Sequence, residues 1–340
     1  MTTAKNHIIS NITVYAALMV SAILTMTACV KEYPEDGKGV DPTEIDLTIE
    51  LSTDPSVTAA SVFSKSGTSS DYVYFVVELY ADEFGGDTIF RREIGAPVDE
   101  NGAASITINE KVHAGSYRLA AFAARTENED GSDCAYNLED ISNIVSAVEG
   151  GTGSSTLEEC YDLRMEIELP HSEWYGADSV SGVLTSPVGR VEVVSEDASE
   201  FIERHSLQAL AADEDFWERY EAVWEYTSYF PTGYNTHGGV PNKSETGVGF
   251  TSGIVHLGGE DVLMGFDYVF VNGESTEVLL TLSVRDRTTG ECLNTYSGLT
   301  AEISKGRTTV IRGRYLTVEK KPGANIDPDF DGDLNFNLDL

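Results

Sequence analysis

Three aspartates near the end of the chain have the side chains and the spacing of calcium ligands. Asp327, Asp329 and Asp331 alternate with other residues and precede a glycine, as at the start of an EF-hand loop. The twelfth position of such a loop would be Leu338, where calcium needs a bidentate Glu. Apolar and polar residues alternate over 334–338, which favours a terminal strand after a polar turn. We therefore expect no metal and no cofactor, with these aspartates as the alternative calcium site.

Aromatic side chains that could stack against sugar rings are concentrated in the second half of the chain. The stretch 217–234 is dense in Trp, Tyr and Phe, and an exposed aromatic platform of this kind would bind glycans. Within it, Trp224 and Tyr226 fall on one face of a predicted strand, so a buried core stripe is the favoured interpretation. Trp174 and Tyr175, in a predicted loop, are the other candidates for ligand binding.

Motifs of the common catalytic classes are missing from the sequence. It contains no HExxH and no GxSxG, and the glycine-rich stretch 150–154 lacks the lysine of a phosphate-binding loop. Among 57 acidic residues, a carboxylate pair for glycoside hydrolysis could still be present. We expect a protein that is not an enzyme, with a secreted glycan hydrolase as the alternative.

Cys29 stands where an exported protein could receive a lipid. It follows Thr27-Ala28 and the mostly apolar run 14–26, and no acidic residue precedes it, a pattern typical of a secretory signal. The run is shorter than the roughly 20 residues of a spanning helix. The pattern resembles the lipobox of bacterial lipoproteins, in which the thiol takes a diacylglycerol before cleavage. The resemblance implies that residues 1–28 are removed and that lipid on Cys29 anchors the mature chain to a membrane.

The next segment, 29–43, is charged, interrupted by Pro and Gly, and without apolar periodicity, which predicts a flexible tether. Its acidic residues resemble the export signal that places Bacteroidetes lipoproteins on the outer face of the outer membrane. The resemblance implies a lipid-anchored protein exposed at the cell surface. The net charge of −35 would repel phosphate backbones, so nucleic acid is excluded as an expected partner.

Three cysteines remain if Cys29 carries lipid: Cys134, Cys160 and Cys292. An exported protein permits disulfides, and three thiols allow at most one within the chain. The sequence leaves open which of them pair.

Short strand patterns separated by turn residues fill the remainder of the chain. The clearest are the alternations over 45–51 and 163–169. Further strands are expected at 72–80, 88–92, 104–108, 117–124, 180–184, 188–194, 220–229, 247–255, 266–271, 278–284, 308–316 and 335–338.

Two short helices are expected between these strands. One would begin at Asn137, and the other at a capping box formed by Asp197 and Glu200. Many short strands with few helices favour antiparallel sandwiches over a parallel α/β sheet. The sequence predicts an all-β fold of two successive antiparallel β-sandwich domains, at 44–185 and 186–340.

Several segments of the second half resemble an uncharacterised family of Bacteroidales surface lipoproteins that is itself similar to fimbrillins, the pilus subunits of these bacteria. The segments are 186–193 (SPVGRVEV), 246–248 (TGV), 265–272 (GFDYVFVN), 312–317 (RGRYLT) and 327–335 (DPDFDGDLN). The resemblance implies two transthyretin-like β-sandwiches and a role in fimbriae or adhesion at the cell surface. The familiar Pro-Met-Ala form departs here to Pro187-Val188-Gly189.

Fimbrillin-like subunits join by strand donation, in which a neighbour's strand fills an open sheet edge. The candidate donors here are Ile45–Leu51 and Leu334–Leu340. In the alternative, both segments pair within their own domain and the chain is a monomer. The resemblance therefore implies fimbrial subunits as partners, and the alternative function is an outer-membrane glycan-binding lipoprotein.

Overall fold

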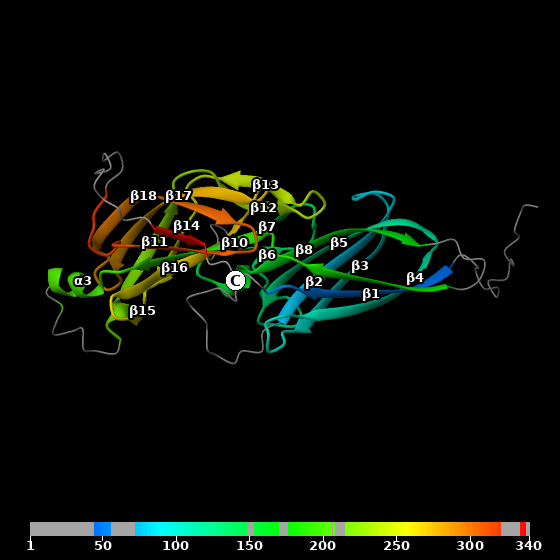
Figure 1. Cartoon of the computed structure of the whole chain (residues 1–340), viewed down its shortest axis with the longest axis horizontal. Helices are drawn as coiled ribbons and strands as arrows, with labels where there is room; N and C mark the ends of the chain where they lie inside the picture. Colours follow the sequence, from blue (N-terminus) through cyan, green and yellow to red (C-terminus); the bar gives the residue numbers. More distant parts are fainter. Residues whose placement is uncertain are drawn as a thin grey trace, which may run out of the picture.

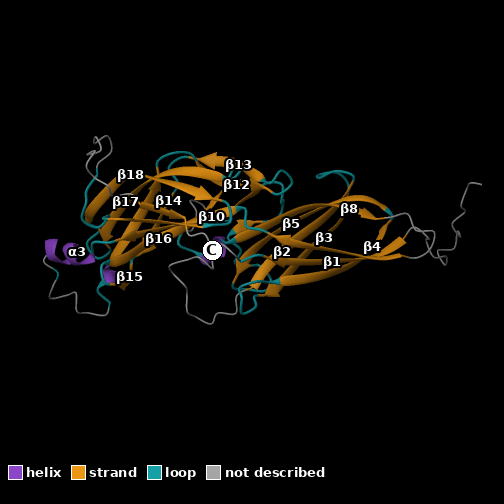
Figure 2. Cartoon of the chain, in the orientation of Figure 1, coloured by secondary structure: helices purple, strands orange, loops and turns teal. Residues whose placement is uncertain are grey.

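The computed structural model describes residues 44–55, 72–147, 153–169, 176–205, 207, 215–320 and 334–337. These residues form two β-sandwiches that lie end to end along the long axis of the molecule (Figures 1 and 2). The predicted all-β fold of two successive sandwiches is confirmed.

The N-terminal sandwich packs a three-stranded sheet against a four-stranded one. The first sheet has the order β4-β1-β9, from β1 (Glu44–Thr53), β4 (Ser105–His113) and β9 (Gly176–Leu184). The second has the order β3-β2-β5-β8, from β2 (Tyr72–Ala81), β3 (Thr88–Pro97), β5 (Gly115–Thr126) and β8 (Cys160–Leu169).

The C-terminal sandwich packs a five-stranded sheet against a four-stranded one. The first sheet has the order β15-β16-β10-β19-β20, from β10 (Val188–Ser195), β15 (Val255–Gly258), β16 (Asp261–Phe270), β19 (Thr308–Gly313) and β20 (Leu334–Asn337). The second has the order β14-β11-β17-β18, from β11 (Tyr220–Tyr226), β14 (Gly249–Gly253), β17 (Ser275–Asp286) and β18 (Cys292–Ser304).

The two sandwiches share one topology, although the sequence contains no strict repeat. In each, the first strand pairs antiparallel with one neighbour (β1 with β4, β10 with β16) and parallel with the other (β1 with β9, β10 with β19). The facing sheets β3-β2-β5-β8 and β14-β11-β17-β18 also correspond in chain order. Two parallel pairs therefore interrupt the antiparallel arrangement that the sequence predicts.

A fifth, smaller sheet joins the two halves of the chain. Its order is β13-β12-β7-β6, from β6 (Tyr136–Asn137), β7 (Ile144–Ser146), β12 (Phe230–Asn235) and β13 (Val240–Glu245). β12 pairs with β7 through Gly233 and Tyr234. The division of the chain at residue 185 thus stays a prediction, because backbone pairing crosses it.

A shared hydrophobic core lies under this joining sheet. Phe122 of β5 and Tyr136 of β6 pack there with Tyr234, Phe266 and Phe270 from the second half. Alternate residues of β2 and β5 face this core, while the others face the core of the N-terminal sandwich. Strands buried on both faces read as near-continuous apolar runs, which explains the sequence of β2.

Side chains of β16 pack into two different cores, and a bulge at Gly265 makes this possible. The glycine has a φ of +126°, and the pairing register between β10 and β16 shifts beside it. Met264 faces the C-terminal core, whereas Phe266, one alternation later, faces the shared core. The bulge exchanges the faces of the strand, as bulges do.

One of the two predicted helices is present in the structure, and the other is not. Helix α3 (Ala198–Arg204) follows Asp197 as predicted, and two 3₁₀ turns, η2 (Thr156–Glu158) and η3 (Trp217–Arg219), complete the described helical residues. The capping box is wrong, because the Asp197 carboxylate accepts hydrogen bonds from Ser195 and Thr317 and none from the first turn of the helix.

The helix expected from Asn137 is also wrong. The Asn137 and Asp140 side chains accept hydrogen bonds from the backbone N–H groups of Glu139 and Ser142, which closes turns between β6 and β7. Such local side-chain bonds compete with helix formation.

Five strands were not predicted, and several predicted ones have different bounds. The new strands are β6, β7, β12, β13 and β18. The strand expected at 220–229 ends at Tyr226, and 247–255 divides into β14 and β15. Among the described residues, no helix is long and apolar enough to cross a membrane.

Candidate functional site

Trp224 and Tyr226, the candidates for an aromatic platform, are buried. Trp224 and Tyr226 are each 1 % exposed, in the core of the C-terminal sandwich. The Trp224 indole N–H donates to the Met264 carbonyl at 3.0 Å, and the Tyr226 hydroxyl donates to Asp267 Oδ2 at 2.6 Å. We therefore correct the ligand-binding interpretation of both residues: they are the core stripe that their alternation favours.

The remaining candidate residues lie outside the described part of the chain. They are the lipidation candidate Cys29, the loop aromatics Trp174 and Tyr175, and the calcium candidates Asp327, Asp329 and Asp331. Their roles stay predictions. Within the described ranges, no group of three or more His, Cys, Asp or Glu side chains could hold a metal ion.

The three cysteines among the described residues are free thiols. Cys134, Cys160 and Cys292 form no disulfide with one another, although the sequence permits one. Burial raises the pKa of Cys134 to about 11 and the pKa of fully buried Cys160 well above its usual value. Cys292 is exposed.

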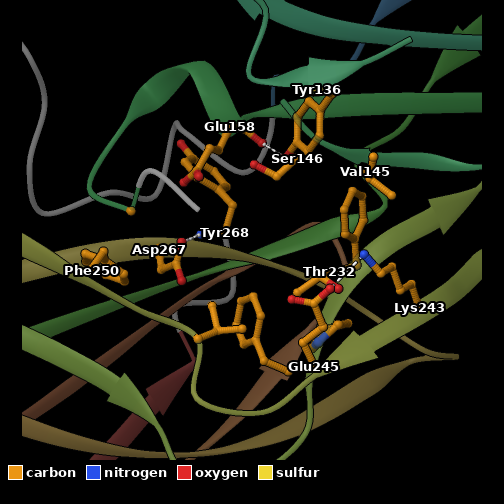
Figure 3. A pocket seen from close by; sticks show the side chains of 15 residues that line it. Tyr136, Val145, Ser146, Glu158, Thr232, Lys243, Glu245, Phe250, Asp267 and Tyr268 are labelled. Atoms are coloured by element: carbon orange, nitrogen blue, oxygen red, sulfur yellow. Dashed lines mark hydrogen bonds and ion pairs between the residues drawn. The ribbon is translucent and has the colours of Figure 1, made fainter. Parts of the chain in front are cut away.

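A cavity of about 210 Å³ lies where the two halves of the chain meet. The first half contributes residues of β6, β7 and η2, and the second half contributes residues of β12, β13, β14 and β16 (Figure 3). Five aromatic side chains line it: Tyr136, Phe230, Phe250, Tyr268 and Phe270. The cavity exists only because long-range pairing brings these strands together.

Two acidic side chains line one side of this cavity. Asp267 is buried, and it accepts hydrogen bonds from the Tyr226 hydroxyl and the Tyr268 N–H at 2.9 Å. Glu158 of η2 lines the same side of the cavity, from the other half of the chain. Burial first, and then the charge of Glu158, raise the pKa of Asp267 well above its usual range.

Lys243 and Glu245 of β13 stand at the outer side of the cavity (Figure 3). Lys243 Nζ lies 2.7 Å from Glu245 Oε1, and both side chains are about half exposed. Thr232 also lines the cavity, and its Oγ1 is buried without a hydrogen bond in the described structure. A buried hydroxyl of this kind is available to a ligand.

A cluster of buried charges lies close to the junction. Arg190 Nε is 2.8 Å from Glu192 Oε1, and the Arg190 guanidinium lies 3.7 Å from the centroid of the Phe266 ring. Arg190 also donates to the Tyr268 hydroxyl at 2.9 Å. These contacts fix β10 against β16 beside the cavity, because a buried arginine must be paired and hydrogen-bonded.

Tyr229 is the aromatic of the 217–234 stretch that faces solvent. It is 74 % exposed and borders an open hollow of about 370 Å³ together with Pro231, Pro241 and Asn242. Sequence reasoning missed it because Tyr229 follows the end of β11, where strand alternation no longer predicts exposure.

The sheet edges differ between the two sandwiches. β20 extends the C-terminal sheet by pairing antiparallel with β19. In the N-terminal sandwich, β9 holds the position equivalent to β19 and is the last described strand of its sheet. Val183 of β9 is 54 % exposed.

Solved structures similar to this chain include two fimbrial proteins. A fimbrial anchor protein from Porphyromonas gingivalis is 10 % identical, with 80 % of this chain and 91 % of that one covered and a TM-score of 0.40. A tip fimbrial protein from Porphyromonas gingivalis, truncated at its C-terminus, is 10 % identical, with 87 % of this chain and 100 % of that one covered and a TM-score of 0.41.

No sequence among the curated proteins matches this chain. A family-level match is nevertheless extensive, because it covers residues 38–339 and so includes both sandwiches and the joining sheet. The chain belongs to this family, DUF6562, a family of unknown function.

Proposed function

We propose that this chain is a lipid-anchored, fimbrillin-like component of the outer cell surface, acting in fimbriae or adhesion by binding or assembly and not by catalysis. The proposal rests on a difference between two equivalent sheet edges, of which one is paired with a further described strand and the other is not. β20 covers the edge of β19, while β9 in the same topological position has no described strand beyond it. A strand from a neighbouring subunit would add to β9 as β20 adds to β19.

Both candidate donor segments are paired inside this chain. β1 is the central strand of its sheet, with β4 on one side and β9 on the other, and β20 pairs with β19. In the described part of the chain, only strands at the sheet edges can therefore accept another strand, which suits a basal or accessory subunit. The fimbrial partners of this subunit are part of the proposal.

Surface labelling of intact cells tests the anchor and the location together. Shaved peptides from residues 72–147 or 215–320 are expected in mass spectra of protease-treated cells, and the chain is expected in sheared appendages. Cys29→Ala should release the chain from the cell surface, while the matched control Cys292→Ala should not. A chain that stays protected from protease in intact cells, or that is absent from the appendage fraction, would count against the proposal.

Glycan binding is the second candidate function, and Tyr229 favours it. Exposed aromatic rings stack on sugars, and Tyr229 stands beside the rigid rings of Pro231 and Pro241. On a glycan array, Tyr229→Ala should abolish any binding of the wild-type protein. Ile89→Ala, also at an exposed apolar residue, is the control.

Glycoside hydrolysis receives no support from the carboxyl pair in the cavity. A hydrolase needs two carboxyls that face the sugar, one of which acts as an acid. Asp267 is instead buried, and both of its oxygens accept hydrogen bonds, from the Tyr226 hydroxyl and the Tyr268 N–H.

A further inference from the structure

The cavity between the two halves of the chain is lined by several aromatic rings. Its volume is about 210 Å³, and the aromatic lining residues are Tyr136, Phe230, Phe250, Tyr268 and Phe270. A dry apolar cavity of about 150 Å³ already accommodates benzene. This cavity therefore has room for one aromatic ring with a short side chain.

Two of the lining rings are held in place by rings behind them. Phe230 packs against Tyr226 with ring centroids 4.1 Å apart, and Phe250 stacks on Trp224 at 5.1 Å. Both supporting rings are fully buried in the core of the C-terminal sandwich. Because this core fixes the rings, the lining is a preformed surface for a ligand, as in most small-molecule sites.

One polar atom of the lining residues is available to an occupant. Thr232 Oγ1 is buried and makes no hydrogen bond within the described residues. A hydroxyl can both donate and accept, so a single hydroxyl on a ligand would satisfy it. A buried hydroxyl without a partner costs free energy, and a ligand that supplies the partner recovers this cost.

The charged residues of the lining are already engaged. Lys243 Nζ lies 2.7 Å from Glu245 Oε1, and both oxygens of Asp267 accept hydrogen bonds, from a hydroxyl and a backbone N–H. Glu158 is not free either. Burial raises the pKa of Asp267, which is the effect of removing a carboxylate from water. A charged ligand would meet the same cost without a free partner, so the lining favours an uncharged one.

We propose that the cavity between β7, β12, β13 and β16 binds a small uncharged aromatic molecule that carries a hydroxyl group. The ring would lie among Phe230, Phe250 and Phe270, in the edge-to-face and offset contacts that aromatic pairs prefer. The hydroxyl would pair with Thr232 Oγ1. This site goes beyond the proposed role in fimbriae and does not depend on it, because it needs neither an anchor nor a second subunit.

Four phenyl compounds of similar shape test this ligand class on the full chain: 2-phenylethanol, ethylbenzene, 3-phenylpropionate and phenethylammonium. Isothermal titration calorimetry should detect binding of the alcohol and of ethylbenzene. The two ions should bind about tenfold more weakly than the alcohol, because the cavity offers their charge no free partner. An ion that binds as tightly as the alcohol, or no binding of either neutral compound up to its solubility limit, would overturn the inference.

Two tryptophan substitutions in the joining sheet locate the binding. Val145 of β7 lines the cavity, so Val145→Trp should fill the space and abolish binding of both neutral compounds. Val240 of β13 is 41 % exposed and lies outside the lining, so Val240→Trp is the matched control and should leave both affinities unchanged. If Val145→Trp leaves binding intact, or Val240→Trp abolishes it as well, the probes bind elsewhere and the inference fails.

Removal of the Thr232 hydroxyl tests how the ligand is oriented. Thr232→Val keeps the shape of the side chain and should weaken 2-phenylethanol about fivefold, the worth of one hydrogen bond, while ethylbenzene keeps its affinity. Thr107→Val, on an exposed position of β4, is the control and should change neither. Equal effects of Thr232→Val on the two compounds would refute recognition of the hydroxyl. This comparison also decides if Val145→Trp does not fold.

Discussion

Truncation of Trp224 distinguishes a core residue from a sugar platform. The side chain is 1 % exposed, stacks on Phe250 with ring centroids 5.1 Å apart, and donates its indole N–H to Met264. Removing a buried Trp side chain costs about 3–5 kcal/mol, because both transfer free energy and packing are lost. For a domain of this size, each kcal/mol lowers the Tm by roughly 2–4 °C, so Trp224→Ala should lower it by about 6–20 °C.

A milder substitution separates the hydrogen bond from the packing. Trp224→Phe keeps much of the ring but leaves the Met264 carbonyl without its indole donor, which should cost about 1–3 kcal/mol. Urea denaturation followed by circular dichroism measures both variants. Tyr229→Ala, at a ring 74 % exposed, is the control and should stay within about 0.5 kcal/mol of wild type. If Trp224→Ala unfolds within about 1 kcal/mol of wild type, the core assignment of β11 is refuted.

Three more measurements probe the junction and the thiols. Burial and the neighbouring carboxyl raise the pKa of Asp267, so the folded chain holds this proton more tightly than the unfolded chain, and the free energy of unfolding should fall as pH rises above the ordinary aspartate pKa near 4. Asp267→Asn should flatten that part of the pH profile; an unchanged slope would contradict the assignment. Gly265→Ala should destabilise by about 1–3 kcal/mol in urea titrations, because a Cβ there meets Ser252 at 2.6 Å and the φ of +126° is strained; a neutral effect would show that the bulge is dispensable. Iodoacetamide should label exposed Cys292 quickly and buried Cys160, whose pKa is raised, only after unfolding; mass spectrometry of the peptides reports both, and early labelling of Cys160 would refute its burial.

Alternation of apolar and polar residues correctly predicts strands that face a single core. Ile45 to Leu51 alternate, and the structure buries their apolar face against the facing sheet of the N-terminal sandwich. The same alternation favours buried positions for Trp224 and Tyr226, and both lie in the core of the C-terminal sandwich. Where a bulge interrupts the alternation, prediction fails. β18 carries Gly298 with a φ of +75°, and its pairing register with β17 shifts at that point.

Local sequence could not reveal the junction. Ile141 and Ile144 are buried, as a helical face would require, but turns formed by Asn137 and Asp140 place them under a sheet instead. Apolar spacing alone does not separate these two arrangements. The cavity combines Glu158 with residues of the second half, and no sequence pattern links positions so far apart before the chain folds.

The parallel pairing of β1 with β9 has a mechanical consequence for a chain held at its N-terminus. β9 ends at Leu184 and leads into β10 at Val188, so β1 and β9 both run toward the second sandwich (Figure 1). A pull that enters at Glu44 and leaves through β10 draws the two strands along their length in opposite directions. The hydrogen bonds between Ile45–Thr53 and Gly176–Leu184 are then loaded in shear, all together, and cannot open one after another like a zipper. The parallel pair β10 and β19 repeats this geometry in the second sandwich, so tension passing along the molecule meets two shear joints in series.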